Sequence, residues 1–204
     1  MKLYYSPGAC SLSPHIILIE SGIPFTLDRV DIASGITESG EVFSRVNPKG
    51  YVPALRLDTG EVLTEGAAIV QYLADSRPQS GLAQAAGTIE RARLQEHLNF
   101  ISSELHKAFT PLFTSNAPAE SKASAPATIG RKLDYIESQL ADGRSFLMGD
   151  RFSVADAYLF AVASWTIPTG IGLDKWPHLK ALVSRITERP SVRTAMLSEG
   201  LIAA

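Results

Sequence analysis

The sequence predicts an α/β domain followed by an all-helical domain. Three observations support this prediction: the chain opens with a strand, a helix and a strand; a short hairpin then leads directly into a helix; and every later apolar pattern has helical spacing. The pattern changes at residues 78–87, which are rich in Gln, Gly, Ser and Ala and have no sustained period. We therefore expect an α/β domain at residues 1–77, a linker at 78–87 and a helical domain at 88–204.

The order of elements in the first domain points to a known architecture. A strand at residues 1–5, a helix at about 11–21 and an alternating strand at 25–30 make a β-α-β opening. Residues 54–57 and 61–64 then flank an Asp-Thr-Gly turn, which is typical of a hairpin, and a helix follows at once. The order β-α-β, loop, β-β-α is that of the thioredoxin fold.

Only helices are expected beyond the linker. They cover about residues 89–113, 121–140, 154–166, 176–188 and 192–199. Pro111 has no amide donor and clashes with the preceding turn, so we expect it to kink or shorten the first of these helices. Ser153 and Asp156 stand three residues apart at the head of an apolar helix, a spacing that favours a capping box with a structural role.

Composition and charge exclude several classes of protein. Hydrophobic residues make up 45% of the 204 and charged residues 20%, which is ordinary for a globular protein. A net charge of -2 provides no basic field for nucleic acid or an anionic membrane, so we expect neither as a partner. The longest apolar stretch, residues 157–163, is too short to cross a bilayer, and the N-terminus lacks the pattern of a signal peptide. These features predict a cytoplasmic protein.

Cys10 is the only cysteine, so it cannot form a disulfide within the chain. It stands where the first strand turns into the first helix, and backbone amides and the helix dipole favour a thiolate there. The alternative is a small, buried apolar side chain. No second cysteine follows, so any redox chemistry uses one thiol. Tyr5 and Ser11 can offer hydroxyl groups to a bound thiol, although Tyr5 can also fill the core face of its strand.

Two further turns are suited to binding an extended peptide. Pro53 directly precedes a strand, which fits either a trans or a cis bond after Val52. A cis bond turns the Val52 backbone groups outward, where they can pair with a peptide as an added strand. At the next strand-to-helix turn, amides near Gly66 can receive a carboxylate, and Glu65 can meet an ammonium group. The alternative for Glu65 is an acidic residue that only stabilises its helix.

Taken together, these segments resemble the glutathione site of bacterial beta-class glutathione transferases. The matching segments are SPGACS at residues 6–11, NPKGYVPAL at 47–55 and LTEGAAI at 63–69. The resemblance continues through NFISSELHK at 99–107, SVADAY at 153–158 and EGLI at 199–202. Each motif alone is weak, but the ordered set is specific and extends over both expected domains.

The resemblance implies a role for each matching residue of the first domain. Cys10 would face the sulfur of glutathione. Val52 with Pro53 would supply the backbone pairing, and Glu65 with Gly66 would hold the γ-glutamyl end.

The resemblance also assigns residues of the second domain. His106 and Lys107 would line the mouth of the site, where cations lower the pKa of a thiolate; without the resemblance, they would be a solvated polar edge of a helix. The family is dimeric, and Asn99, Ser103 and Glu104 from a neighbouring subunit would complete the pocket.

An apolar pocket for a second substrate is expected from the helical domain. Phe109, Phe113 and Trp165 are candidate walls of this pocket, although aromatic residues on helices more often belong to a core. The other histidines have no metal-ligand spacing, so we expect no metal, and no cofactor apart from glutathione as cosubstrate.

Three functions fit these predictions. The first is a homodimeric transferase that conjugates the glutathione thiolate to small hydrophobic electrophiles. The second is a glutathione-dependent monothiol disulfide reductase that uses Cys10. The third is a glutathione-binding or ligand-binding protein with little turnover, since a fold does not fix a function.

One position departs from the family pattern. Relatives usually carry a lysine that reaches the glycine carboxylate of glutathione, and Gly35 stands at that place here. No Lys or Arg occurs from residue 30 to 44, so no close neighbour replaces this cation. Arg45 or Lys49 is the candidate replacement from the other side of the loop.

Overall fold

A five-stranded mixed sheet organises the first part of the chain. The strands are β1 (Lys2–Tyr5), β2 (Thr26–Asp31), β3 (Ile36–Thr37), β4 (Ala54–Arg56) and β5 (Val62–Thr64), in the spatial order β3-β2-β1-β4-β5. Strand β1 runs parallel to β2, and the other neighbouring pairs are antiparallel. The structure is a computed structural model, and it describes residues 1–203.

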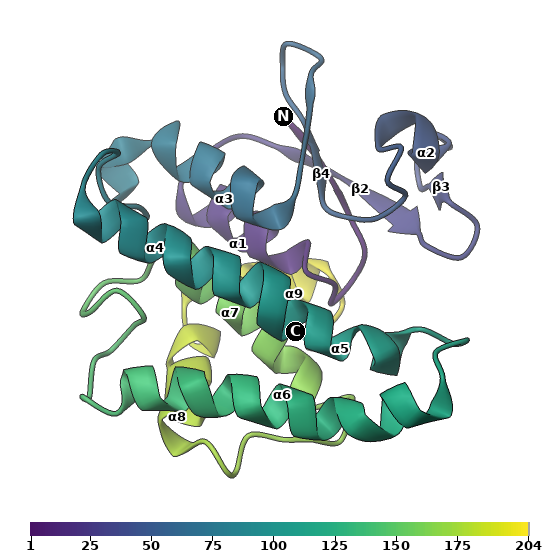
Figure 1. Ribbon diagram of the computed structural model, residues 1–204. Helices are drawn as coiled ribbons and strands as arrows, with labels where there is room; N and C mark the ends of the chain where they lie inside the picture. Colours follow the sequence, from purple (N-terminus) through teal and green to yellow (C-terminus); the bar gives the residue numbers. More distant parts are fainter. Residues whose placement is uncertain (204) are drawn as a thin grey trace. The chain divides into compact units, whose positions relative to one another are not determined.

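Helices cover both faces of this sheet because successive strand residues point to opposite sides. Tyr4 and Ala54, which are paired in register, belong to a buried apolar cluster with Phe43 and Val46 of the short helix α2 (Phe43–Val46). The other face is covered by α1 (Leu12–Glu20) and α3 (Gly66–Asp75), which lie side by side (Figure 1).

The last helix of the chain, α9 (Pro190–Ser198), packs against α1. Arg189 and Ser191 both donate hydrogen bonds to the Glu20 carboxylate at the end of α1. For this reason residues from 188 onward group with residues 1–83 in one compact unit, unit 1, and Gln84–Thr187 form unit 2. This division differs from the expected one, in which the whole of 88–204 belonged to the helical domain.

Unit 2 consists of helices. They are α4 (Ile89–Phe100), a π-helical turn (Ile101–Leu105), α5 (His106–Phe113), α6 (Ala119–Leu140), α7 (Val154–Ala163), a 3-10 turn (Ser164–Thr166) and α8 (Pro177–Thr187). All ten residues of α7 are buried, as expected for a helix that is apolar on every side. Helix α7, which packs against α4, α8 and the π-helical turn, is therefore the core element of unit 2.

The predicted fold class, a thioredoxin-like domain followed by helices, is confirmed. Strand β3 and helix α2 were not predicted, because each has four residues or fewer and no repeated pattern. Pro111 lies in the final turns of α5, and the continuous helical run from residue 89 ends at Phe113. Helix α6 begins at Ala119, earlier than expected, and continues through Pro126. Within residues 1–203, no helix is both long enough and apolar enough to cross a membrane.

Candidate functional site

The Cys10 side chain lies in the turn between β1 and α1, next to the backbone of Val52. Its Sγ donates to the Val52 carbonyl oxygen at 3.5 Å, and the side chain is 9% exposed. The Cys10 carbonyl accepts hydrogen bonds from the Ser13 amide (3.1 Å) and hydroxyl (2.9 Å). These contacts anchor the turn to the first residues of α1 and keep the thiol beside Val52, the residue predicted to pair with a bound peptide.

The two hydroxyl groups near Cys10 have different surroundings. Ser11 is fully buried, and its hydroxyl accepts from the Ser6 amide and donates to the Ser6 carbonyl, each at 3.2 Å. The Ser11 hydroxyl therefore closes the turn in this structure. Tyr5 is 8% exposed; burial, and then the negative charge of Glu199, raise the pKa of its phenol. The Tyr5 hydroxyl thus stays protonated, and the substrate-binding roles of both residues remain predictions.

The Val52–Pro53 peptide bond is cis, the rarer of the two forms that the sequence allowed. It directly precedes β4, and both residues are buried. Val52 also belongs to the apolar cluster under α2, so its side chain is held in the core. The Val52 carbonyl, which accepts from Cys10, is the backbone group that joins this turn to the thiol.

Glu65 has an unusual backbone and a fixed carboxylate. Its φ is 70°, and it is the one residue other than glycine with a positive φ among residues 1–203. Such a conformation costs about 1–3 kcal/mol, and it persists where surrounding contacts determine it. One carboxylate oxygen, Oε1, accepts from Lys49 Nζ at 2.5 Å and from the Tyr51 hydroxyl at 3.0 Å. Lys49 also donates to the Thr64 hydroxyl, so two residues of the loop before β4 hold the Glu65 side chain.

These contacts change the acidity of both partners of Glu65. The hydrogen bond to Glu65 raises the pKa of Lys49. Burial, followed by the hydrogen bond to Glu65, raises the pKa of Tyr51. Lys49 therefore stays charged and Tyr51 stays protonated at neutral pH. The sequence motif contained both residues, but their pairing with Glu65 was not predicted.

Helix α3 begins immediately after Glu65. Its ladder opens with the amides of Ala68 and Ile69, which both donate to the Glu65 carbonyl. The amides of Gly66 and Ala67 precede the ladder at the positive end of the helix, a position that favours a carboxylate. Gly66 is buried, and because it has no side chain nothing of its own covers its backbone amide.

The loop at Gly35 is built around left-handed backbone. Gly35 has a φ of 69°, its amide donates to Asp31 (2.8 Å), and its carbonyl accepts from Phe43 (2.8 Å). A Cβ at this position would meet no atom within 4 Å, so there is space for a side chain, but the backbone conformation opposes one. Of the two candidate replacement cations, Lys49 is already paired with Glu65.

Unit 2 contains an aromatic cluster at the end of α5. Trp165 is 8% exposed and makes edge contacts with His106 (4.8 Å between centroids), Phe109 (5.5 Å) and Phe113 (5.3 Å). Phe109 is fully buried, whereas Phe113 is 55% exposed. The structure thus brings the three predicted pocket aromatics together, and it separates a core member, Phe109, from a surface member, Phe113.

His106 is oriented by a residue that was not predicted as part of the site. Its Nδ1 lies 3.0 Å from the hydroxyl of Tyr158, which is 3% exposed on α7. The ring also stands edge-on to that of Trp165. Only the tertiary structure of unit 2 brings Tyr158 close to His106, so spacing along the sequence contained no signal for it. Lys107, the next residue, is exposed.

Comparisons with known proteins identify the family. Residues 8–76 match the model for the glutathione S-transferase N-terminal domain, and residues 100–190 match the model for the C-terminal domain. Glutathione S-transferase GstA of Escherichia coli O157:H7 is 48% identical over 98% of this chain and 100% of its own. The chain belongs to the glutathione S-transferase family.

Solved structures agree with this assignment. A beta-class glutathione S-transferase from Sphingomonas chungbukensis is 47% identical, with a TM-score of 0.96 over 99% of this chain and 100% of its own. A sphingomonad glutathione S-transferase, solved in complex with glutathione, is 48% identical, with a TM-score of 0.95 and the same coverage. The predicted resemblance to bacterial beta-class transferases is therefore confirmed.

Three other predicted binding residues of this transferase lie along the helix α4 and the π-helical turn. Asn99, Ser103 and Glu104 are all exposed. The Ser103 hydroxyl donates to the Asn99 carbonyl at 2.8 Å, and Lys132 of α6 donates to the Glu104 carboxylate. Their contribution to a partner's pocket remains a prediction.

Asp156 has the structural role that its spacing predicted. It forms a capping box with Ser153 and also accepts from the Leu147 amide at 2.8 Å. Burial raises the pKa of Asp156 to about 6, although the hydrogen bonds it accepts act in the opposite direction. The carboxylate thus joins the start of α7 to the preceding loop, and it takes no part in the candidate site.

Proposed function

We propose that the protein conjugates the thiolate of glutathione to small hydrophobic electrophiles. The observation that carries this proposal is the connected geometry of unit 1. The Cys10 thiol donates a hydrogen bond to the Val52 carbonyl, and the hydroxyl of the adjacent Tyr51 donates one to the Glu65 carboxylate. This connected strip runs from a thiol turn to a helix N-terminus beside a carboxylate, and these groups match the chemistry of a γ-glutamyl thiol peptide.

Each group of glutathione has a counterpart on this strip. The backbone of Val52 pairs with the cysteinyl residue, as an added strand does. Glu65 receives the α-ammonium of the γ-glutamyl group, and the first amides of α3 receive its α-carboxylate. The bound sulfur lies at the Cys10 turn, where the N-terminus of α1 favours the thiolate. Holding the thiolate in a fixed position is then the main contribution to catalysis.

The aromatic cluster of unit 2 binds the electrophile in this proposal. Phe113 has an exposed apolar surface, and its ring contacts the rings of Phe109 and Trp165. His106 and Lys107 keep their predicted roles as cations that favour the thiolate. The protein acts as a cytoplasmic homodimer, to which Asn99, Ser103 and Glu104 contribute from the partner subunit.

Thiol reduction is the second candidate, and the position of Cys10 favours it. In that reaction the Cys10 thiolate attacks a glutathionyl mixed disulfide, forms a disulfide with the glutathione sulfur and releases the other thiolate. A second glutathione thiolate then releases Cys10 as oxidised glutathione forms.

Two assays on the same preparation separate these functions. Conjugation is measured with chlorodinitrobenzene and glutathione, and reduction with a hydroxyethyl–glutathione mixed disulfide. We expect turnover of chlorodinitrobenzene in the conjugation assay. Turnover of the mixed disulfide alone would make the protein a reductase, and glutathione binding without either activity would make it a binding protein.

A further inference from the structure

The hydroxyl of Tyr158 is a polar group inside the core element of unit 2. Tyr158 is 3% exposed, and all ten residues of α7 are buried. Burying a hydroxyl costs free energy unless it forms a hydrogen bond. A hydrogen bond of 3.0 Å joins this hydroxyl to Nδ1 of His106. Phenylalanine would fill the same space without the cost, so the hydroxyl indicates a role that involves His106.

Trp165 holds the ring of His106 from a second side. It stands seven residues after Tyr158 in one continuous helical run, so the two side chains lie on one face, two turns apart. The rings of His106 and Trp165 are 4.8 Å apart between centroids, at an angle of 75°. Such packing fixes the plane of the imidazole but not its flip, because a ring nitrogen and a ring C–H are similar in size. The hydrogen bond from Tyr158 is what distinguishes Nδ1 from Cδ2.

The backbone before His106 is also unusual. His106 is the first residue of α5, and its amide donates to the Ile101 carbonyl, which closes the π-helical turn. Turns of this kind are rare and occur frequently at functional sites. The backbone and the Tyr158 hydroxyl therefore both indicate that the orientation of His106 matters to function.

Acid and base strengths set the direction of the hydrogen bond between Tyr158 and His106. A phenol is a stronger acid than the N–H of a neutral imidazole, and an imidazole nitrogen is a stronger base than a phenol oxygen. When the ring is uncharged, the favoured arrangement is donation from the Tyr158 hydroxyl to Nδ1. A neutral imidazole has one proton, which is then on Nε2. The bond thus leaves a hydrogen-bond donor at Nε2 of His106.

On the basis of the proposed function, we propose that Tyr158 is a positioning residue for the reaction. Its hydroxyl fixes the flip and the tautomer of the His106 ring, so that Nε2–H donates to the thiolate of bound glutathione. A ring that gains a second proton keeps the one on Nε2, so this donor is present whether or not His106 is charged. Without the hydroxyl, the ring has two flips and two tautomers, and one combination alone presents the proton correctly.

The tautomer of His106 can be read from its two ring nitrogens by NMR. The four histidines of the chain are labelled with nitrogen-15, and the His106 signals are assigned by their loss in His106→Ala. Spectra are recorded at about pH 9, where histidine side chains are uncharged. We expect the proton on Nε2 alone in the unaltered protein, and a mixture of both tautomers in Tyr158→Phe. A proton on Nδ1 in the unaltered protein, or identical spectra for the two proteins, would overturn the proposal.

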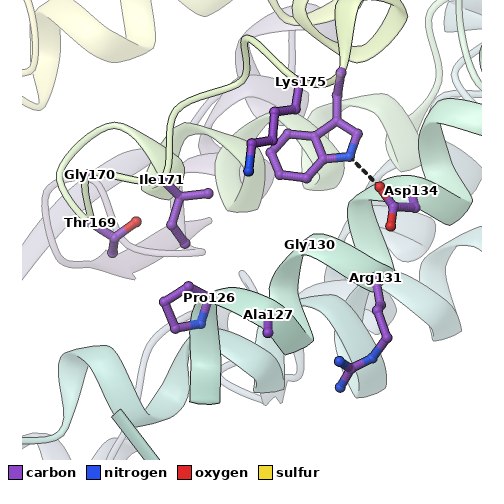
Figure 2. A pocket seen from close by; sticks show the side chains of 10 residues that line it. Pro126, Ala127, Gly130, Arg131, Asp134, Thr169, Gly170, Ile171 and Lys175 are labelled. Carbon is purple, nitrogen blue, oxygen red and sulfur yellow. Dashed lines mark hydrogen bonds between the residues drawn. The ribbon is translucent and has the colours of Figure 1, made fainter. Parts of the chain in front are cut away.

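A matched control removes a similar hydrogen bond elsewhere in unit 2. Trp176 Nε1 donates to the Asp134 carboxylate at 2.8 Å, between α6 and the segment that leads into α8; Figure 2 shows this bond as a dashed line. Like the bond of His106, it is partly buried and joins a ring nitrogen to a side-chain oxygen. Asp134→Ala should lower the melting temperature about as much as Tyr158→Phe, but it should leave the His106 tautomer unchanged. A mixture of tautomers in Asp134→Ala would show that general loosening of unit 2, and not the lost hydroxyl, moves His106.

Kinetics then test whether the hydroxyl acts through His106. Tyr158→Phe should lower kcat for chlorodinitrobenzene about two- to tenfold, the range of one hydrogen bond. The same change in a His106→Ala background should have no further effect, because the group that the hydroxyl positions is gone. An equal loss of kcat in both backgrounds would show that Tyr158 is only structural. Absence of conjugation in the unaltered protein would contradict the proposed function, whereas the NMR measurement, which needs no substrate, decides the role of Tyr158 separately.

Discussion

The candidate sites of the two units are made of different kinds of groups. In unit 1 most of the groups proposed to hold glutathione are backbone groups, the Val52 carbonyl and the first amides of α3, and the carboxylate of Glu65 joins them. In unit 2 they are side chains, with Trp165 at the centre of an aromatic cluster. Backbone groups at turns have a fixed geometry, which suits one constant ligand. A surface of aromatic side chains tolerates ligands of different shapes, which suits variable electrophiles.

This difference predicts that a change at Cys10 affects one reaction and not the other. Cys10→Ala should abolish reduction of a mixed disulfide, because that reaction needs a covalent bond to Cys10. Conjugation should remain substantially intact, because glutathione brings its own sulfur and the backbone still holds it. Paired assays on the variant check this expectation. Full reductase activity in Cys10→Ala would show that Cys10 has a different role.

A change at Glu65 should affect glutathione rather than the electrophile. Glu65→Gln removes a charged hydrogen bond to the ligand's ammonium group, which contributes about 1.5–3 kcal/mol and corresponds to a roughly ten- to hundredfold higher Kd. Calorimetry gives the Kd, and Glu61→Gln, which removes an exposed carboxylate of the neighbouring turn, is the matched control. If both variants bind glutathione with the same Kd, Glu65 does not contact the ligand and only stabilises α3.

Two phenylalanines of unit 2 allow a core position to be distinguished from a candidate pocket position. Phe109 is fully buried, so Phe109→Ala should lower the free energy of unfolding by about 3–5 kcal/mol. Phe113 is 55% exposed, so Phe113→Ala should leave the fold nearly as stable and raise KM for chlorodinitrobenzene a few-fold. Thermal unfolding and steady-state kinetics measure the two effects. An unchanged KM in Phe113→Ala would remove this surface from the electrophile site.

The last expected effect concerns the loop at Gly35. Gly35→Lys should tighten glutathione binding several-fold to tenfold, since it supplies a cation for the glycine carboxylate. A side chain at a φ of 69° costs about 1–2 kcal/mol of stability whatever its charge. Gly35→Met has the same strain without the charge and is therefore the control. Calorimetry at low and high salt should show tighter glutathione binding for Gly35→Lys but not for Gly35→Met. High salt should reduce this gain in affinity. Equal affinities would show that this loop does not contact the glycine end.

The sequence was more informative about unit 1 than about unit 2. Cys10, Pro53 and Gly66 could be found because each stands at a strand or helix boundary, where residue type and backbone role are coupled. The contacts of Glu65 with Lys49 and Tyr51 could not, since they depend on how the loop folds back onto the start of α3.

In unit 2 the helical spacing of aromatic residues is the same for a core and for a pocket. Phe109 and Phe113 are four residues apart on one helix, and only their tertiary environment distinguishes them. Tyr158 illustrates the same limit, because its contact with His106 joins positions 52 residues apart. Likewise, α9 packs against α1 through long-range contacts that no local pattern indicates.

The proposed function depends on recognition of the γ-glutamyl end of glutathione by unit 1. Calorimetric titration of the unaltered protein with glutathione and with cysteinylglycine tests it most directly, because the second peptide keeps the thiol and the glycine but lacks the γ-glutamyl group. We expect glutathione to bind at least about tenfold more tightly, the equivalent of one charged hydrogen bond. Equal affinity for the two peptides would contradict it.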